Sequence, residues 1–268
     1  SQLGAVTTKG VSPVPWEGNP GIRTAEGPSS NINAVGLQNP GVDHYLEDDL
    51  PKLKAINATV IANVAGHCDD DYAEVVSKLD DSPADMLEIN VSCPNVSAGG
   101  MSVGTDPVAL SRLITRLRKL TDKKMIVKLT PNVTDITVPA RAAVESGADA
   151  LSLINTLLGM AVDARTRRPK LARVVGGYSG PAVKPVALRM VWQAVGAVNI
   201  PVVGLGGIAT GRDALEFVMA GATAVQVGAA NFANPRAMET IADEMAAWMD
   251  KNGVKTLDEI RGCARNAE

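Results

Sequence analysis

Short apolar segments rich in Val, Ile and Leu alternate along the chain with longer amphipathic segments, and this alternation limits the possible folds more than any other feature. It is typical of a parallel sheet whose strands are joined by crossover helices. Seven strands are predicted, at 4–8, 59–63, 86–91, 125–129, 150–154, 201–205 and 224–227. Helices are predicted at 43–55, 69–79, 106–120, 137–146, 185–195, 211–220 and 235–251.

The fold class predicted from this pattern is α/β, in the form of a (β/α)8 TIM barrel. A closed barrel of this kind needs eight strands, and the sequence starts with Ser1 almost directly inside an apolar segment. We therefore expect a single domain over residues 1–268 that lacks its first strand. The alternative is an open doubly wound sheet, but no G-x-G-x-x-G motif follows an early strand, as the dinucleotide site of that fold requires.

Charge and cysteine content narrow the function classes. The net charge of −3 and the pI near 5.5 provide no basic face for nucleic acid or for an anionic membrane. No apolar run approaches the roughly 20 residues of a membrane-spanning helix. The three cysteines are widely spaced and there are only two histidines. We expect no metal site, no disulfide framework and a reducing, cytoplasmic environment.

The active site of such a barrel lies at the carboxyl ends of its strands. These ends carry polar side chains or glycines, namely Lys9, Asn63, Asn90 with Cys93, Lys128, Asn155 with Thr156, Gly206 with Gly207, and Gly228. Each one alone could be structural, because a lysine can be a solvated charge and an asparagine a turn former. Their joint occurrence favours a functional site. Two long connections, 10–41 and 155–184, are expected to be loops that contribute to it.

Glycines follow the last two predicted strands, at Gly206, Gly207 and Gly228. In barrels, the loops at these positions commonly bind phosphate through backbone N–H groups. We predict a phosphate site here. The alternative is that these glycines only permit tight turns.

Cys93 follows a strand in the polar setting Ser-Cys-Pro-Asn. It could be a buried hydrophobic residue, a nucleophile, or a general base that removes a proton from carbon, and the polar setting favours the base. Lys128 is an isolated charge in an apolar strand and needs an anionic partner, since burying an unpaired ammonium group is costly. A reduced flavin would supply that partner. Lys9 could face a flavin or a substrate carboxylate in the same way.

Six motifs in a fixed order extend over essentially the whole chain. They are NINAVGLQNPG at 31–41, IANVAG at 61–66, NVSCPN at 90–95, KLTPNVTD at 128–135, INT at 154–156 and GYSGPA at 177–182. Together they closely resemble the motifs of dihydroorotate dehydrogenase of class 1, subclass B. Two departures are that the family's first strand, with its Ala-Ser-Gly flavin contact, is absent, and that Ala229 stands where threonine is common.

The resemblance implies FMN-dependent oxidation of (S)-dihydroorotate to orotate in pyrimidine synthesis, with Cys93 as the base that removes the C5 proton and FMN as the acceptor of hydride from C6. The substrate-binding residues it implies are Lys9, Asn33, Ala34, Val35, Gly36, Leu37, Asn90, Asn95, Asn155 and Thr156. The FMN-binding residues it implies are Lys9, Gly10, Asn63, Asn90, Lys128, Ile154, Gly180, Gly206, Gly207, Gly228 and Ala229.

The resemblance also implies a partner, an electron-transfer subunit that carries FAD and a 2Fe-2S iron–sulfur cluster and reduces NAD. This chain has no cysteine cluster for iron–sulfur ligation and no dinucleotide motif. We expect it to form the homodimeric core of a heterotetramer. Two alternatives stay open: a related flavin barrel that acts on another dihydropyrimidine, and a non-catalytic truncated barrel that binds phosphate ligands or a partner without turnover.

Overall fold

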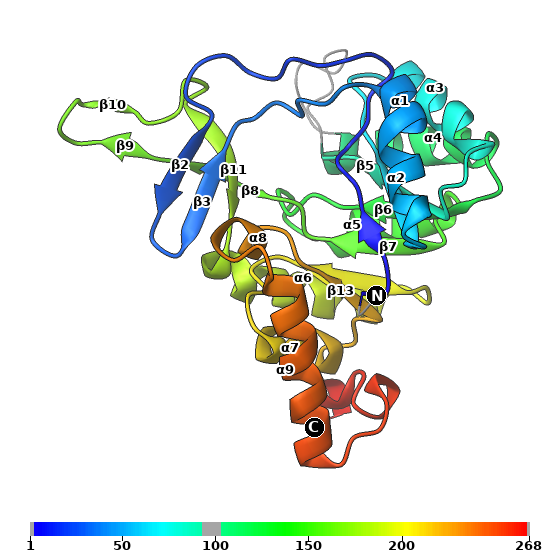
Figure 1. Ribbon diagram of the computed structural model, residues 1–268, viewed down its shortest axis with the longest axis vertical. Coiled ribbons are helices and arrows are strands. Elements are labelled where there is room, and N and C mark those ends of the chain that lie inside the picture. Colours follow the sequence, from blue (N-terminus) through cyan, green and yellow to red (C-terminus); the bar gives the residue numbers. More distant parts are fainter. Residues whose placement is uncertain (1–2, 93–102, 267–268) are drawn as a thin grey trace. The chain divides into compact units, whose positions relative to one another are not determined.

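The computed structural model describes residues 3–92 and 103–266 (Figure 1). Its internal contacts divide the chain into two compact units. The first unit contains Leu3–Gly18 and Gly36–Leu151, and the second contains Asn19–Val35 and Ser152–Glu268.

Seven strands form one sheet in the order β1-β4-β5-β6-β7-β12-β13. They are β1 (Val6–Thr7), β4 (Val60–Val64), β5 (Met86–Asn90), β6 (Lys124–Lys128), β7 (Ala150–Leu153), β12 (Val202–Leu205) and β13 (Ala224–Gln226). The pairs β1–β4, β4–β5, β5–β6 and β12–β13 are parallel. Every one of these strands overlaps a predicted strand, and the predicted fold class, α/β of the (β/α)8 type, is confirmed.

The helices also follow the predicted order. They are α1 (Val42–His44), η1 (Tyr45–Asp49), α2 (Leu50–Ala55), α3 (Asp69–Asp80), η3 (Val103–Thr105), α4 (Pro107–Arg118), α5 (Thr137–Glu145), η4 (Pro181–Val183), α6 (Lys184–Ala197), α7 (Gly211–Met219), α8 (Ala230–Ala233), α9 (Ala237–Asn252), η5 (Leu257–Glu259) and η6 (Cys263–Asn266). The helix predicted at 43–55 contains a π-helical segment, η1, between α1 and α2. Of the others, η5 and η6 follow the last predicted helix, and the rest overlap a single predicted helix or lie between two of them.

The core of the first unit forms because α3 and α4 are each apolar on one face. The buried residues of α4 are Leu110, Leu113, Ile114 and Leu117, which is the i, i+3, i+4, i+7 spacing of an amphipathic helix. Asp106 caps this helix by accepting a hydrogen bond from the backbone N–H of Val108 at 2.9 Å, and proline follows directly. Strand β4 is buried along its whole length, as expected for a parallel strand covered on both faces.

The second unit contains an antiparallel sheet that was not predicted. Its strand order is β2-β3-β11-β8, and a small hairpin of β9 and β10 adjoins it. The bounds are β2 (Thr24–Gly27), β3 (Ser30–Asn33), β8 (Leu157–Met160), β9 (Val162–Asp163), β10 (Arg168–Pro169) and β11 (Val175–Ser179). Figure 1 shows the β2–β3 hairpin running beside β11 and β8. The expectation of irregular loops at 10–41 and 155–184 was therefore wrong in part, because strands this short carry little sequence signal until they pair.

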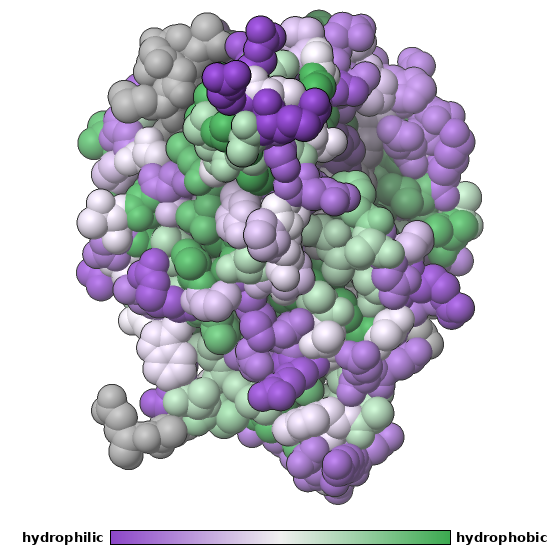
Figure 2. Space-filling model, turned by 90° about the vertical axis from the view of Figure 1, so that its left-hand side faces the viewer, coloured by the Kyte–Doolittle hydropathy of each residue, from purple (hydrophilic) through white to green (hydrophobic). Residues whose placement is uncertain are grey.

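The helices of the second unit pack around α7 and α9. Leu215 and Val218 of α7 are buried with Ile260, and Met245 and Trp248 of α9 pack against them. Gly253 ends α9 in the left-handed conformation, with φ of 67°. In the described part of the chain, no helix has the length and apolar character needed to cross a membrane. The face in Figure 2 shows apolar side chains reaching the surface among hydrophilic ones.

Candidate active site

In the first unit, polar side chains from three neighbouring strands point to the same face of the sheet. Asn63 of β4 is the register partner of Glu88 of β5, and Asn90 of β5 is the partner of Lys128 of β6. Glu88 and Asn90 are two residues apart, so their side chains share a face. The register therefore brings the predicted FMN ligands Asn63, Asn90 and Lys128 together around Glu88, at the carboxyl ends of β4, β5 and β6.

Glu88 connects two of these predicted ligands. Its Oε2 accepts a hydrogen bond from Asn63 Nδ2 at 2.6 Å, and Lys128 Nζ lies 3.4 Å from the same oxygen. The Glu88 side chain is completely buried, whereas 15% of the Lys128 side chain is exposed. The anionic partner that Lys128 was predicted to need is therefore present in the protein itself. Sequence analysis missed Glu88, although it is a charge in an apolar strand by the same criterion that singled out Lys128.

Asn90 shapes the chain where β5 ends. Its backbone carbonyl accepts a hydrogen bond from the Tyr72 hydroxyl at 2.7 Å. Its Oδ1 accepts one from the backbone N–H of Ser92 at 3.2 Å, which turns the chain out of the strand. The Ser92 Oγ is buried and has no hydrogen-bond partner among the residues that the structure describes. The predicted base Cys93 and the predicted substrate ligand Asn95 lie outside the described residues.

Lys9 and Gly10 follow β1, and Lys9 is exposed while Gly10 is buried. A Cβ at Gly10 would lie 2.8 Å from Asn63 Oδ1, so this position has no room for a side chain. Further along the first unit, Gly36 and Leu37 both have positive φ, at 76° and 53°. Leucine rarely adopts this conformation, so this turn is held in an unusual backbone shape.

In the second unit, the residues that follow β12 are glycines, so backbone groups rather than side chains are available there. Gly206 and Gly207 follow β12 with φ of 122° and 77°. A Cβ at Gly206 would lie 2.7 Å from Ala187 Cβ. A Cβ at Gly207 would lie 2.8 Å from the backbone nitrogen of Lys184 and 2.9 Å from the carbonyl oxygen of Gly180. Glycine is required at both positions, and the structure brings the predicted FMN ligands Gly180 and Gly207 side by side.

Gly228 differs from these two glycines. A Cβ added there would meet no heavy atom within 4 Å, so the backbone faces open space. Ala229 follows it and precedes α8. The backbone N–H of Asn231 donates to the Gly228 carbonyl at 3.1 Å. Asn231 Oδ1 is buried and accepts no hydrogen bond from the described residues 3–92 and 103–266. An unsatisfied buried acceptor beside a predicted phosphate loop is a feature that sequence analysis missed.

The remaining predicted ligands of the second unit lie on β3 and after β7. Asn33 Nδ2 donates to the carbonyl oxygen of Gly177 at 3.4 Å. The backbone N–H of Ala34 donates to the carbonyl oxygen of Arg23 at 2.7 Å. The backbone N–H of Ile154 donates to the carbonyl of Leu205 at 2.9 Å. Val35, Asn155 and Thr156 are half-buried. Gly177 leaves room for the Thr156 side chain, which lies directly against it.

An ion-pair network supports the Gly206–Gly207 turn. Lys184 Nζ lies 2.6 Å from Asp213 Oδ1 and 2.8 Å from Glu216 Oε2. Asp213 Oδ2 also accepts hydrogen bonds from the backbone N–H groups of Ala209 and Thr210, at 3.0 and 2.9 Å. Burial acts to raise the pKa of Asp213, but the Lys184 ammonium and these donors outweigh it and hold the pKa below its ordinary value. The loop after β12 is thus fixed to the first residue of α6.

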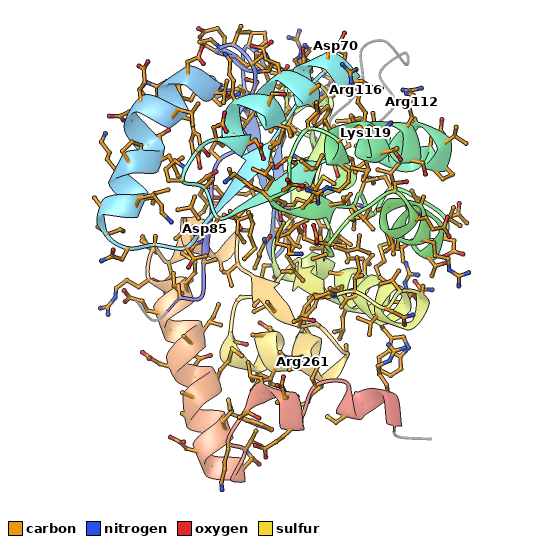
Figure 3. All side chains as sticks on the ribbon, turned by 90° about the vertical axis from the view of Figure 1, so that its right-hand side faces the viewer. Asp70, Asp85, Arg112, Arg116, Lys119 and Arg261 are labelled. Atoms are coloured by element: carbon orange, nitrogen blue, oxygen red, sulfur yellow. The ribbon has the colours of Figure 1, made fainter. Side chains whose placement is uncertain are left out.

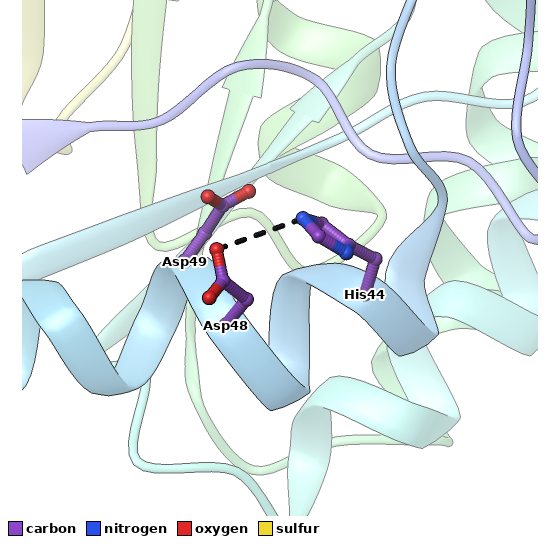
Figure 4. A group of neighbouring side chains, drawn as sticks. All are labelled: His44, Asp48 and Asp49. Carbon is purple, nitrogen blue, oxygen red and sulfur yellow. Dashed lines mark ion pairs between the residues drawn. The ribbon is translucent and has the colours of Figure 1, made fainter.

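The first unit also contains charged groups that pair with one another on its helices. Figure 3 shows Asp70 of α3 beside Arg116 of α4, and their charged atoms are 2.6 Å apart. Figure 4 shows the side chains of His44, Asp48 and Asp49. Each offers one atom that could bind a metal ion, and these three atoms lie within 4.8 Å of one another. Lys52 Nζ lies 2.6 Å from Asp48, so that carboxylate already has a cationic partner.

Parallel strands joined by helices, with polar side chains and glycines at the strand ends, define a (β/α)8-type α/β protein with a strand-end site. A family model described as dihydroorotate dehydrogenase matches residues 1–249. The chain belongs to the dihydroorotate dehydrogenase family.

Three relatives support the subclass. They are proteins named dihydroorotate dehydrogenase B (NAD(+)), catalytic subunit, from Alkaliphilus metalliredigens, Geotalea uraniireducens and Lachnoclostridium phytofermentans. The first is 54% identical over 98% of this chain and 87% of its own length. The second is 52% identical over 97% and 86%, and the third 49% identical over 99% and 88%. The resemblance to class 1, subclass B predicted from the motifs is confirmed.

Proposed function

We propose that this chain oxidises (S)-dihydroorotate to orotate with bound FMN, as the catalytic subunit of a two-component dihydroorotate dehydrogenase. The observation that carries the proposal is the cluster of Asn63, Glu88 and Lys128 at the strand ends of the first unit. Asn63 and Lys128 also belong to the motifs that resemble the family. The names of the relatives at 49% to 54% identity support the reaction and the subunit role.

The residues present fit FMN in two respects. Lys128 supplies a largely buried cation, 15% exposed, for the electron-rich edge of a flavin, and the buried Asn63 and Asn90 supply carboxamides beside it. In the second unit, the exposed Gly228 supplies accessible backbone for a phosphate. The FMN ligands proposed are Lys9, Gly10, Asn63, Asn90, Lys128, Ile154, Gly180, Gly206, Gly207, Gly228 and Ala229.

The substrate ligands proposed are Lys9, Asn33 to Leu37, Asn90, Asn95, Asn155 and Thr156. In the reaction, the Cys93 thiolate takes the proton from C5 of dihydroorotate. The hydride and its two electrons leave C6, and the C5–C6 bond becomes the double bond of orotate. FMN, when bound, supplies the acceptor for that hydride. Lys9 would orient the substrate by pairing with its carboxylate.

We also propose that the electrons pass to NAD through a separate subunit with FAD and an iron–sulfur cluster, bound to a homodimer of this chain. The supporting fact is that the relatives' names contain both "NAD(+)" and "catalytic subunit". Co-purification with such a subunit, and NAD reduction only in its presence, would test this part separately.

Anaerobic mixing of FMN-loaded protein with dihydroorotate tests the reaction itself. The visible absorbance of the oxidised flavin is expected to bleach in a single turnover. Protein that binds FMN but does not bleach with dihydroorotate would contradict the substrate assignment, and faster bleaching by a dihydropyrimidine without a carboxylate would favour the related flavin barrel. Failure to bind FMN at all would favour the non-catalytic alternative.

A further inference from the structure

Glu88 occupies a position where an unpaired charge would be costly. It lies between Leu87 and Ile89 in β5, and all three side chains are completely buried. Of the buried polar residues in the part of the chain that the structure describes, Glu88 alone carries a formal charge. A buried carboxylate is tolerated when cationic and hydrogen-bonding partners surround it.

Two residues that contact Glu88 are proposed to bind FMN. One oxygen, Oε2, accepts from Asn63 Nδ2 at 2.6 Å and lies 3.4 Å from Lys128 Nζ. Both partners project from neighbouring parallel strands in fixed register, so the distances are set by the sheet rather than by flexible loops. Glu88 is absent from the set of ligands proposed above.

Glu88 has two effects on these partners. It orients the Asn63 carboxamide, because Nδ2 points to the carboxylate while Oδ1 lies on the side of Gly10. It also offsets the charge of Lys128, because an ammonium group and a carboxylate in contact have no net charge together. Lys128 therefore presents much less positive potential to a bound group than an isolated lysine at the same position would.

We propose that Glu88 is a positioning residue that lowers the redox potential of bound FMN by offsetting the charge of Lys128. This inference rests on the proposed function, since it requires FMN beside Lys128. Two-electron reduction adds negative charge to the pyrimidine edge of a flavin, and an uncompensated ammonium group would stabilise that charge strongly. With Glu88 in place the stabilisation is moderate, so electrons taken from the substrate are held less tightly and pass on to the next carrier more readily.

The test is Glu88→Gln, which keeps the shape and an acceptor oxygen but removes the negative charge. The midpoint potential of bound FMN, measured by equilibration with a reference dye, is expected to shift to a more positive value. Equivalently, the preference of the protein for reduced over oxidised FMN should increase by roughly tenfold or more. Lys128→Met should shift the potential in the opposite direction, and the double variant should lie between the two single variants.

Glu74→Gln is the matched control, because Glu74 forms an exposed ion pair with Lys78 on α3 at 3.2 Å. Its potential should equal that of the parent protein. An unchanged potential in Glu88→Gln overturns the inference while leaving FMN binding, and hence the proposed function, intact. Failure of the parent protein to bind FMN overturns the proposed function instead.

If Glu88→Gln does not retain FMN, Glu88→Asp serves as the second variant. It keeps the negative charge but moves it away from Lys128 by one methylene group. A smaller positive shift of the potential supports the inference, and a potential identical to that of the parent protein overturns it.

Discussion

In the first unit, the ends of β4, β5 and β6 bring an amide, a carboxylate and an ammonium group into contact, whereas in the second unit the turns after β12 and β13 offer bare backbone. Side chains can hold charge and exchange protons. Backbone N–H groups can bind an anion but cannot change their protonation. If the proposed function holds, the groups proposed for the reaction chemistry belong to the first unit and the glycines proposed to bind phosphate belong to the second. Substitutions in the two units should therefore have different effects on catalysis and on stability.

The largest effect is expected from Cys93→Ala, which removes the proposed base but leaves the phosphate loops intact. The rate of flavin reduction by dihydroorotate should fall by roughly 10²- to 10⁴-fold, the contribution of general base catalysis. FMN affinity should stay as it is. Anaerobic stopped-flow absorbance measures both, and Cys68→Ala, at the start of α3, is the control. Equal reduction rates in Cys93→Ala and the parent protein would remove Cys93 from the mechanism.

The next largest effect is expected from Lys128→Met, which removes the Lys128 ammonium group from its pair with the buried Glu88 carboxylate. Loss of one member of a buried pair should lower the free energy of unfolding of the FMN-free protein by about 3 kcal/mol. The double variant with Glu88→Gln should regain much of that loss, because no charge is then left buried. Urea unfolding measures the three variants.

Lys78→Met is the control for this cycle. Lys78 pairs with Asp43 at 2.8 Å on the surface, with 34% of its side chain exposed. An exposed pair contributes about 0–1 kcal/mol, so this variant should be close to the parent protein. If the double variant were as unstable as the sum of both single changes, the pair would not be energetically coupled.

A smaller loss of stability is expected from Gly207→Ala in the second unit, for a steric reason. The residue has φ of 77°, and a Cβ would approach the Lys184 nitrogen at 2.8 Å. The left-handed conformation costs about 1–2 kcal/mol for alanine, and the backbone contact adds to it. Gly253→Ala isolates the first cost, because its φ is 67° and a Cβ there meets no heavy atom within 4 Å. Equal losses in the two variants, measured by thermal unfolding, would contradict the close approach of Lys184 to Gly207.

The comparison of the two units also separates what sequence can predict from what it cannot. The glycine turns were predictable, since a glycine directly after a strand commonly marks a tight turn. The contact of Glu88 with Lys128 was not, because the two are 40 residues apart and meet only through the register of β5 and β6. The antiparallel sheet of the second unit was missed for the same reason, as Asn33 and Gly177 pair across 144 positions. Local sequence patterns predict helices, strands and turns. Contacts between side chains and pairing between distant strands depend on the register of the folded sheet.

The smallest effect is expected from Asp213→Asn, which tests whether the charge of Asp213 contributes to the stability of the second unit. The pKa of Asp213 is held below its ordinary value of 3.8, because Lys184 and backbone donors outweigh the effect of burial. Its contribution to stability is therefore complete above pH 3.8 and is lost as the pH falls through the lower folded-state pKa.

At neutral pH the Asp213→Asn variant, which keeps an acceptor oxygen, should be less stable by about 1 kcal/mol, the net contribution of a typical hydrogen bond, and the deficit should shrink in acid. Urea unfolding at neutral and acidic pH measures it. Asp258→Asn is the control, because Asp258 forms an exposed pair with Arg261, which Figure 3 labels, at 2.6 Å. A deficit that stayed constant into acid would mean that Asp213 supports the Gly206–Gly207 turn through its shape alone. The turn after β12 would then depend on backbone and packing, as the contrast with the first unit implies, and the charge of Lys184 would be incidental to it.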